Sequence, residues 1–320
     1  MVNIIIPAYN AHQTIHKTLA SILMQDCLDE IIITIVDDCS NEPYDYLLKD
    51  FSYLDNLRII RKKSNTGCGQ SRQFGIDNCD CEYFMFLDAD DCLYCPSAVR
   101  ELLRTIKESD YDYVISDFVE ELSDETYILI QKSGVWMHGK IFKTKFIVEN
   151  NIRFNNTRLN EDHAFNSLVL YSNGKGKYIN YITYVWKYNK MSLVRRPDQE
   201  EFSIDEFIKN ACYTITEFIN RKYKEESIIE KYVDYTITFY GYYNKYLEYK
   251  FPVDFVNRYL NSLMKFYANF PSQYKKLISD EIVKDRYYKN DVVQELIRER
   301  IICKCSWDDF IMRFSDIDKN

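Results

Sequence analysis

Residues 84–91 have the sequence FMFLDADD, an apolar segment that leads directly into the acidic residues Asp88, Asp90 and Asp91. The apolar run is typical of a buried β-strand, and its end would bring three carboxylates close together, where they repel one another. A hard divalent cation with oxygen ligands, Mg²⁺ or Mn²⁺, relieves that repulsion. Alternation along an extended strand puts Asp88 and Asp90 on the same side, which predicts that these two hold an ion. The alternative is that the acids end a strand and cap the next helix.

Outward from this segment, short apolar runs alternate with helical patterns over the first 120 residues. This alternation predicts β-α-β units and a mostly parallel sheet flanked by helices. The predicted strands cover residues 2–6, 30–36, 57–61, 82–87, 112–118, 126–130 and 177–187. A capping box of Asn10 and Gln13 is expected to open the first helix.

A polar stretch at residues 195–200 separates this part from a tail with helical periodicity. Ser203 and Glu206 are expected to cap the first helix of the tail. Further helices are predicted at residues 227–250, 253–266, 272–283 and 291–303. We therefore predict a catalytic domain at residues 1–198 and a helical module at residues 199–320.

The composition excludes several classes of protein. The 320 residues are 46% hydrophobic and 28% charged, close to the average for globular proteins. The 41 Lys and Arg against 49 Asp and Glu give a net charge of −8, which argues against nucleic acid as a partner. The apolar runs are too short to cross a bilayer, and the N-terminus does not resemble a signal peptide. We expect a cytoplasmic protein whose ten cysteines are reduced.

Two further motifs follow predicted strands. Asp37 and Asp38 come after the second strand, where an acid can accept hydrogen bonds from a base or a ribose. Residues 65–72, NTGCGQSR, form a glycine-bearing loop that opens a helix with Arg72 one turn in, an arrangement suited to an anion or a base edge. Neither the Walker A pattern nor G-x-G-x-x-G occurs, which disfavours two common nucleotide folds.

The order and spacing of these motifs resemble the family 2 glycosyltransferases. The resemblance rests on residues 7–10 (PAYN), 36–40 (VDDCS), 65–72 and 87–91 (LDADD). It continues through residues 139–143, 160–162 and 187–192, and so covers about the first 195 residues. The helical tail matches no motif of the family.

The resemblance implies a nucleotide-sugar-binding fold of the A type, with the donor at the carboxyl edge of the sheet and Mn²⁺ or Mg²⁺ on its diphosphate. The residues that it implies for donor binding are Pro7, Tyr9, Asp38, Arg72, Asp88, Lys187 and Ser192. It implies Asp90 as the direct metal ligand, together with Asp88. His138 lies near these elements in the sequence and is a further candidate ligand because imidazole binds metals.

The resemblance also implies Asp162 as the catalytic base of an inverting transfer, with Glu161 as the alternative base. The alternative is that this acidic pair has only a structural role at the N-terminus of a helix, where the helix dipole favours acids. Trp136 and Trp186 are either an acceptor platform or core residues.

The implied donor is a UDP-sugar, and the acceptor is a hydroxyl of a glycan, a wall polymer or a lipid-linked intermediate. The aromatic helical tail leaves open a peripheral contact with the inner face of the membrane, and self-association. Two alternatives remain. A sugar nucleotidyltransferase usually carries a glycine-rich basic loop after the first strand, which residues 7–10 lack. A non-catalytic binding module would be expected to have lost the acids.

Overall fold

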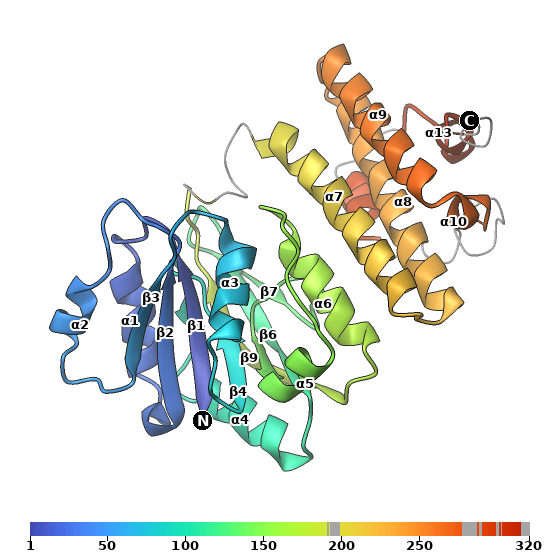
Figure 1. Cartoon of the computed structure of the whole chain (residues 1–320). Helices are drawn as coiled ribbons and strands as arrows, with labels where there is room; N and C mark the ends of the chain where they lie inside the picture. Colours follow the sequence, from blue (N-terminus) through green and yellow to red (C-terminus); the bar gives the residue numbers. More distant parts are fainter. Residues whose placement is uncertain are drawn as a thin grey trace. The chain divides into compact units, whose positions relative to one another are not determined.

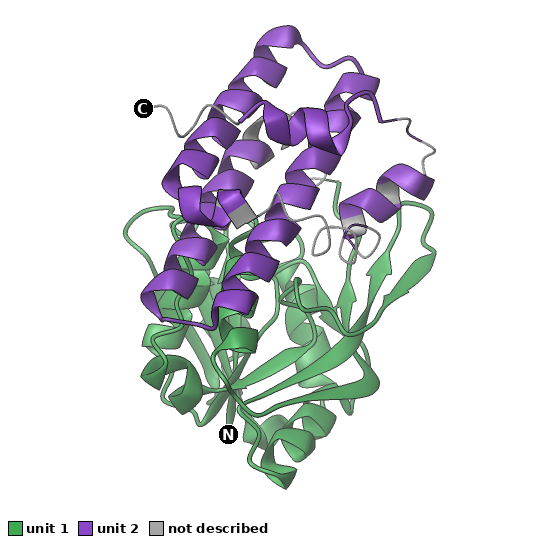
Figure 2. Ribbon diagram, turned by 90° about the vertical axis from the view of Figure 1, so that its right-hand side faces the viewer, with its two compact units in different colours: residues 1–197 green, residues 198–320 purple. Residues whose placement is uncertain are grey.

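The structure, a computed structural model, describes residues 1–190, 192, 199–276, 287, 290–298, 301 and 303–314. The chain divides into two compact units, residues 1–197 and residues 198–320 (Figure 2). Among the described residues, no helix has both the length and the apolar character needed to cross a membrane.

The first unit is built on a nine-stranded mixed sheet of order β3-β2-β1-β4-β8-β6-β9-β5, with β7 paired to β6 (Figure 1). The strands are β1 (Val2–Ala8), β2 (Ile31–Asp37), β3 (Leu57–Arg61), β4 (Tyr83–Phe86), β5 (Cys92–Leu93), β6 (Tyr113–Glu121), β7 (Tyr127–Ile130), β8 (Lys140–Lys143) and β9 (Gly176–Trp186). The run from β3 to β4 is parallel, and β8 joins it antiparallel. The predicted fold class, a mostly parallel sheet flanked by helices, is confirmed.

Helices cover both faces of this sheet because its strands are apolar on both sides. They are α1 (Ile15–Leu23), α2 (Tyr46–Asp50), α3 (Cys68–Asp77), α4 (Ala98–Glu108), α5 (Thr144–Glu149) and α6 (Glu161–Tyr171), with a short 3₁₀ turn, η1 (Leu28–Glu30). Ile4 and Ile6 of β1 belong to the core shared with α1 and α4. Ile5 points the other way, toward Gly75 of α3.

The second unit contains α7 (Gln199–Asn220), α8 (Glu225–Glu248), α9 (Val253–Asn269), α10 (Pro271–Lys276), α12 (Asp291–Arg298) and α13 (Trp307–Met312). Its core is aromatic: Tyr232 of α8 stacks on Phe266 of α9 with ring centroids 5.2 Å apart, and both rings are fully buried. The sequence contains 28 tyrosines, and several of those in this unit are buried in its core. Part of the helix predicted at residues 272–283 lies outside the described residues.

Both predicted capping boxes are wrong. The first helix begins at Ile15, and Asn10 instead adopts a left-handed φ of 51° and accepts a hydrogen bond from the Asn41 amide at 2.9 Å. Asn10 thus ties the β1–α1 loop to the loop after β2. In the tail, α7 begins at Gln199, so Ser203 lies inside the helix.

Gly75 offers a test of how closely α3 packs on β1. A Cβ at this position would overlap the side chain of fully buried Ile5. We expect Gly75→Ala to destabilise the protein by about 1–3 kcal/mol, because overpacking outweighs the better helix propensity of alanine. Urea unfolding measures the change. The control Phe74→Ala, at an exposed position on the same helix, should change stability by less than about 0.5 kcal/mol; equal losses for the two variants would contradict this packing.

Candidate active site

The acidic segment forms a turn after β4. The strand ends at Phe86, and the Asp91 amide donates to the Asp88 carbonyl at 3.0 Å. The chain is therefore not extended through Asp88 and Asp90, and this turn brings Asp88 and Asp91 within reach of each other. An ion shared by Asp88 and Asp90 stays a prediction. Asp90 accepts a hydrogen bond from Asn189 Nδ2 at 2.7 Å.

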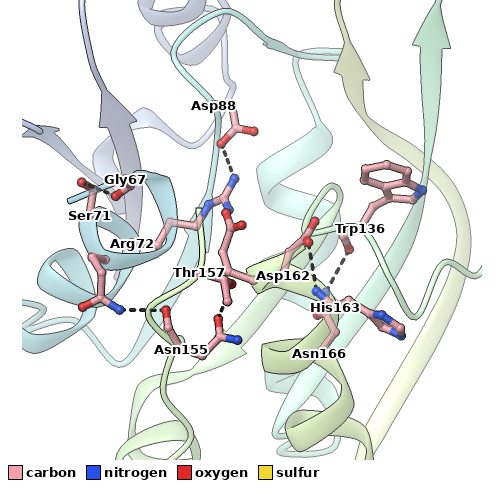
Figure 3. A network of polar contacts seen from close by, with 12 residues as sticks. Gly67, Ser71, Arg72, Asp88, Trp136, Asn155, Thr157, Asp162, His163 and Asn166 are labelled. Carbon is pink, nitrogen blue, oxygen red and sulfur yellow. Dashed lines mark hydrogen bonds and ion pairs between the residues drawn. The ribbon is translucent and has the colours of Figure 1, made fainter. Parts of the chain in front are cut away.

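Arg72 of α3 connects this turn to the start of α6 (Figure 3). Its guanidinium donates to Asp88 at 2.7 Å and to Glu161 at 3.0 Å. Arg72 and Glu161 are both buried, so the two contacts are charge-assisted hydrogen bonds shielded from solvent. Gly69 makes the approach of the helices possible, since a Cβ there would overlap the Glu161 side chain.

The pKa values of these buried groups are shifted in different directions. Burial raises the pKa of Glu161 to about 7, although Arg72 opposes the shift. Burial acts on Asp88 in the same sense, but Arg72 and His138 outweigh it and hold the pKa of Asp88 below its usual range. Burial also raises the pKa of Asp91, and the nearby Asp90 and Asp88 add to this rise. The turn therefore holds more negative charge than Arg72 alone compensates.

Glu161 and Asp162 form the first turn of α6, where the helix dipole favours acids. The Asp162 carboxylate accepts a hydrogen bond from the His163 amide at 2.9 Å. Burial raises the pKa of Asp162, while Arg72 opposes that rise. In Figure 3, Asp162 lies between Arg72 and Trp136.

Asp38 organises the glycine-bearing loop at the end of β2. Its carboxylate accepts hydrogen bonds from the Thr66 amide at 3.1 Å, the Gly67 amide at 2.8 Å and Lys62 Nζ at 2.7 Å. Lys62 also donates to Thr66 and Ser71. The loop before α3 is therefore held over the carboxyl ends of β1 and β2.

The remaining predicted donor residues are placed at or near the same edge. Pro7 is buried within β1, and Tyr9, just beyond that strand, is half-exposed. The Lys187 amide donates to Asp91 at 2.7 Å, and its side chain pairs with Glu121. The Ser192 amide donates to the Asn189 carbonyl. Their contacts with a donor stay predictions.

A divalent ion fits one group of side chains. Asp88, Asp91 and His138 each offer a ligand atom within 4.8 Å of the others. His138 Nε2 is 3.9 Å from Asp88 and 4.0 Å from Asp91, and the Nδ1 atom is buried without a hydrogen-bond partner among the described residues. Two carboxylates and an imidazole suit Mn²⁺ better than Mg²⁺, which prefers oxygen ligands. Direct ligation by Asp90 stays a prediction.

Sequence reasoning missed three residues of this site, Lys62, Tyr184 and Asn189, and it gave Asp91 no role of its own as a metal ligand. Tyr184 Oη donates to Asp91 at 2.6 Å and accepts from the Asp88 amide at 3.2 Å. Asp91 was visible as the third acid of the motif, but its role depends on the turn. No sequence signal identified Tyr184, because one tyrosine in a tyrosine-rich strand carries no distinguishing pattern.

The sequence profile described as "Glycosyl transferase family 2" matches residues 3–165, which contain the turn, Arg72 and the acidic start of α6. The chain belongs to glycosyltransferase family 2.

Several curated glycosyltransferases are similar to this chain over part of its length. Glycosyltransferase GlyA of Streptococcus pneumoniae is 25% identical over 61% of the chain and 31% of that protein. The processive diacylglycerol beta-glycosyltransferase of Mycoplasma genitalium is 27% identical over 53% of the chain and 50% of that protein. The poly(ribitol-phosphate) beta-N-acetylglucosaminyltransferase TarP of Staphylococcus aureus is 30% identical over 37% of the chain and 36% of that protein. The chain thus spans half or less of each relative.

The fold extends beyond the matched region. The crystal structure of S. aureus TarS 1-349 in complex with UDP-GlcNAc superimposes with a TM-score of 0.71, covering 95% of this chain and 93% of that one. The sequence identity is 16%, so this likeness concerns the fold.

Arg72→Met tests the charge balance of the glycosyltransferase site. The variant leaves Asp88 and Glu161 without their buried cation, and we expect it to lose roughly 3 kcal/mol of stability near neutral pH. Without Arg72, the effect of burial on Glu161 is unopposed, and its pKa in the folded protein lies further above that in the unfolded chain. Deprotonation of Glu161 then costs stability as the pH rises, so the stability lost in Arg72→Met should shrink when the pH falls from about 7.5 to about 5.

Urea unfolding at the two pH values measures the deficit. Arg58→Met is the matched control, because Arg58 pairs with Asp80 on the surface. It should lose less than about 1 kcal/mol at either pH. If Arg72→Met lost the same unfolding free energy relative to wild type at both pH values, the proposed charge balance would be contradicted.

Proposed function

We propose that this enzyme transfers a sugar from a UDP-sugar donor to a hydroxyl of a glycan, a wall polymer or a lipid-linked acceptor, with inversion at the anomeric carbon. The observation that carries the proposal is the convergence of the Asp88 turn, Arg72 and the Glu161–Asp162 pair at one edge of the sheet. The TarS structures with UDP and UDP-GlcNAc support a uridine donor. The polymer and lipid acceptors named for the S. aureus and M. genitalium relatives support the acceptor classes.

Asp162 is the base in this proposal. Its raised pKa makes it a stronger proton acceptor than an exposed aspartate, as deprotonation of an acceptor hydroxyl requires. Glu161 is less suited, because its Oε1 atom is engaged by the buried Arg72 guanidinium at 3.0 Å. Asp162 takes the proton while the acceptor oxygen attacks the anomeric carbon from the face opposite the diphosphate.

Asp88, Asp91 and His138 are the residues that would hold Mn²⁺. A bound divalent ion supplies charge stabilisation to the leaving diphosphate. In the structure, the carboxylates of Asp88 and Asp91 already lie close to each other and to the imidazole of His138. Asp38 and Lys62 hold the neighbouring loop, where the resemblance implies the nucleoside.

Asp162→Asn tests the base. We expect the variant to release UDP from the UDP-sugar at least about 100-fold more slowly, because the amide cannot accept the proton. Donor affinity measured by calorimetry should stay within about twofold, since the amide keeps the shape of the side chain. Asp80→Asn, an exposed aspartate in the segment after α3, is the matched control and should keep the wild-type rate. A near wild-type rate for Asp162→Asn would assign the base to another residue.

Metal affinity provides a separate test. We expect Mn²⁺ binding to tighten as pH rises, because Asp91 has a raised pKa and must lose its proton to bind the ion. Calorimetry in buffers of different ionisation enthalpy measures the proton release. His138→Gln should weaken Mn²⁺ binding at least about tenfold, and the exposed control His16→Gln should not. Equal affinities in wild type and His138→Gln would remove His138 from the metal site.

A further inference from the structure

Five aromatic rings extend outward from the acidic turn. His138 stacks on Tyr184 with centroids 4.5 Å apart, and Phe118 packs edge-on against the same imidazole. These three rings are buried. Trp136 and Trp186 form the outer end of the cluster: their rings lie 4.9 Å apart, and each is only partly buried. The rings of Trp136 and Trp186 therefore form a partly accessible aromatic surface, and the His138 ring lies between this surface and the acidic turn.

The helix that carries Asp162 also positions Trp136 (Figure 3). Asn166 lies one turn after Asp162, and the two residues therefore share a face of α6. Its side-chain amide donates to the Val135 carbonyl at 2.6 Å and to the Trp136 carbonyl at 3.2 Å. Lys140, which is buried, donates to the same Trp136 carbonyl.

These bonds fix the backbone of Trp136, whose ring packs against the core beside His138 and Trp186 and stays partly exposed. Within the described ranges, the Trp136 indole N–H has no hydrogen-bond partner, although the Trp136 carbonyl accepts from two side chains. An isolated core tryptophan would normally bury its ring and satisfy its N–H. Trp136 instead combines a rigid backbone with a partly open, flat apolar face and a donor at its edge.

This combination is complementary to a pyranose. A sugar ring presents a flat C–H face to an aromatic ring and hydroxyls at its rim to hydrogen-bond donors. An acyclic polyol phosphate has no such face and would need a free cation. The lysine beside Trp186, Lys187, is paired with Glu121, and the amine of Lys140 is bound to Trp136. The carboxylate of Asp162, which lies beside Trp136 in Figure 3, would repel an anionic acceptor.

We propose that Trp136, supported by Trp186, is the acceptor subsite, and that the accepting hydroxyl belongs to an uncharged pyranose stacked on the Trp136 ring. This inference rests on the proposed glycosyl transfer and specifies its acceptor class. Asn166 and Lys140 act as positioning residues, which hold the stacking ring beside the base.

Kinetics with defined acceptors tests this subsite. Wild-type enzyme is assayed for UDP release with its UDP-sugar donor and Mn²⁺, using as probes water alone, methyl glucoside, methyl galactoside, methyl N-acetylglucosaminide and ribitol 5-phosphate. At least one pyranoside should accelerate release in a saturable way. Trp136→Leu should raise the KM for that pyranoside at least about tenfold while changing the KM for the donor less than about twofold.

Two variants make the comparison specific. Trp136→Phe retains an aromatic face, and we expect it to recover most of the acceptor KM lost in Trp136→Leu. Trp307→Phe, in the aromatic core of the second unit against Tyr240, is the matched control and should leave both KM values unchanged. Thermal unfolding of each variant establishes that it is folded.

The contradicting results are distinct. An unchanged pyranoside KM in folded Trp136→Leu, or acceleration by ribitol 5-phosphate alone, would overturn the subsite while leaving glycosyl transfer intact. If the wild-type enzyme released UDP in water alone but no pyranoside accelerated the release, the subsite would also be overturned. Absence of donor binding and of UDP release in wild type would overturn the proposed function, and the subsite with it.

Discussion

The buried guanidinium of Arg72 is the interaction on which the site depends. It joins the turn after β4 to the first residue of α6 through Asp88 and Glu161. A buried cation is tolerated only when it is paired, and the two acids are tolerated only because the cation lies between them. Gly69 is needed for this contact because a side chain at position 69 would overlap the side chain of Glu161. The position of Asp162, the next residue along, follows from this contact.

The same edge of the sheet gathers two further sets of polar groups. Asp38 and Lys62 fasten the loop before α3, and Tyr184 holds Asp91 beside Asp88. In each set a side chain from one strand end fixes the backbone or side chain of another, so the site is preorganised before any ligand arrives. The carboxylates around His138 remain incompletely compensated, which is the property that a divalent ion requires of its site.

The sequence predicted the sheet well because apolar strands and turn residues are local signals. Residues 57–61 form β3 as expected, and the acids do follow the strand that ends at Phe86. Side-chain roles were harder to predict, because they depend on how the chain bends. The hydrogen bond from the Asp91 amide to the Asp88 carbonyl closes a turn, and Asp91 lies within reach of His138 in it. Asn10 was expected to cap a helix, but its side chain accepts a hydrogen bond from the Asn41 amide, thirty-one residues away in the sequence.

In the proposed function, the turn, Arg72 and His138 form one site for a metal and a nucleotide donor. Anomalous diffraction from crystals grown with UDP and Mn²⁺ locates the metal in this site. We expect a manganese peak bounded by the side chains of Asp88, Asp91 and His138, with Arg72 still joining Asp88 to Glu161. A peak held by Asp90 without Asp91 and His138, or UDP bound away from this edge of the sheet, would contradict it.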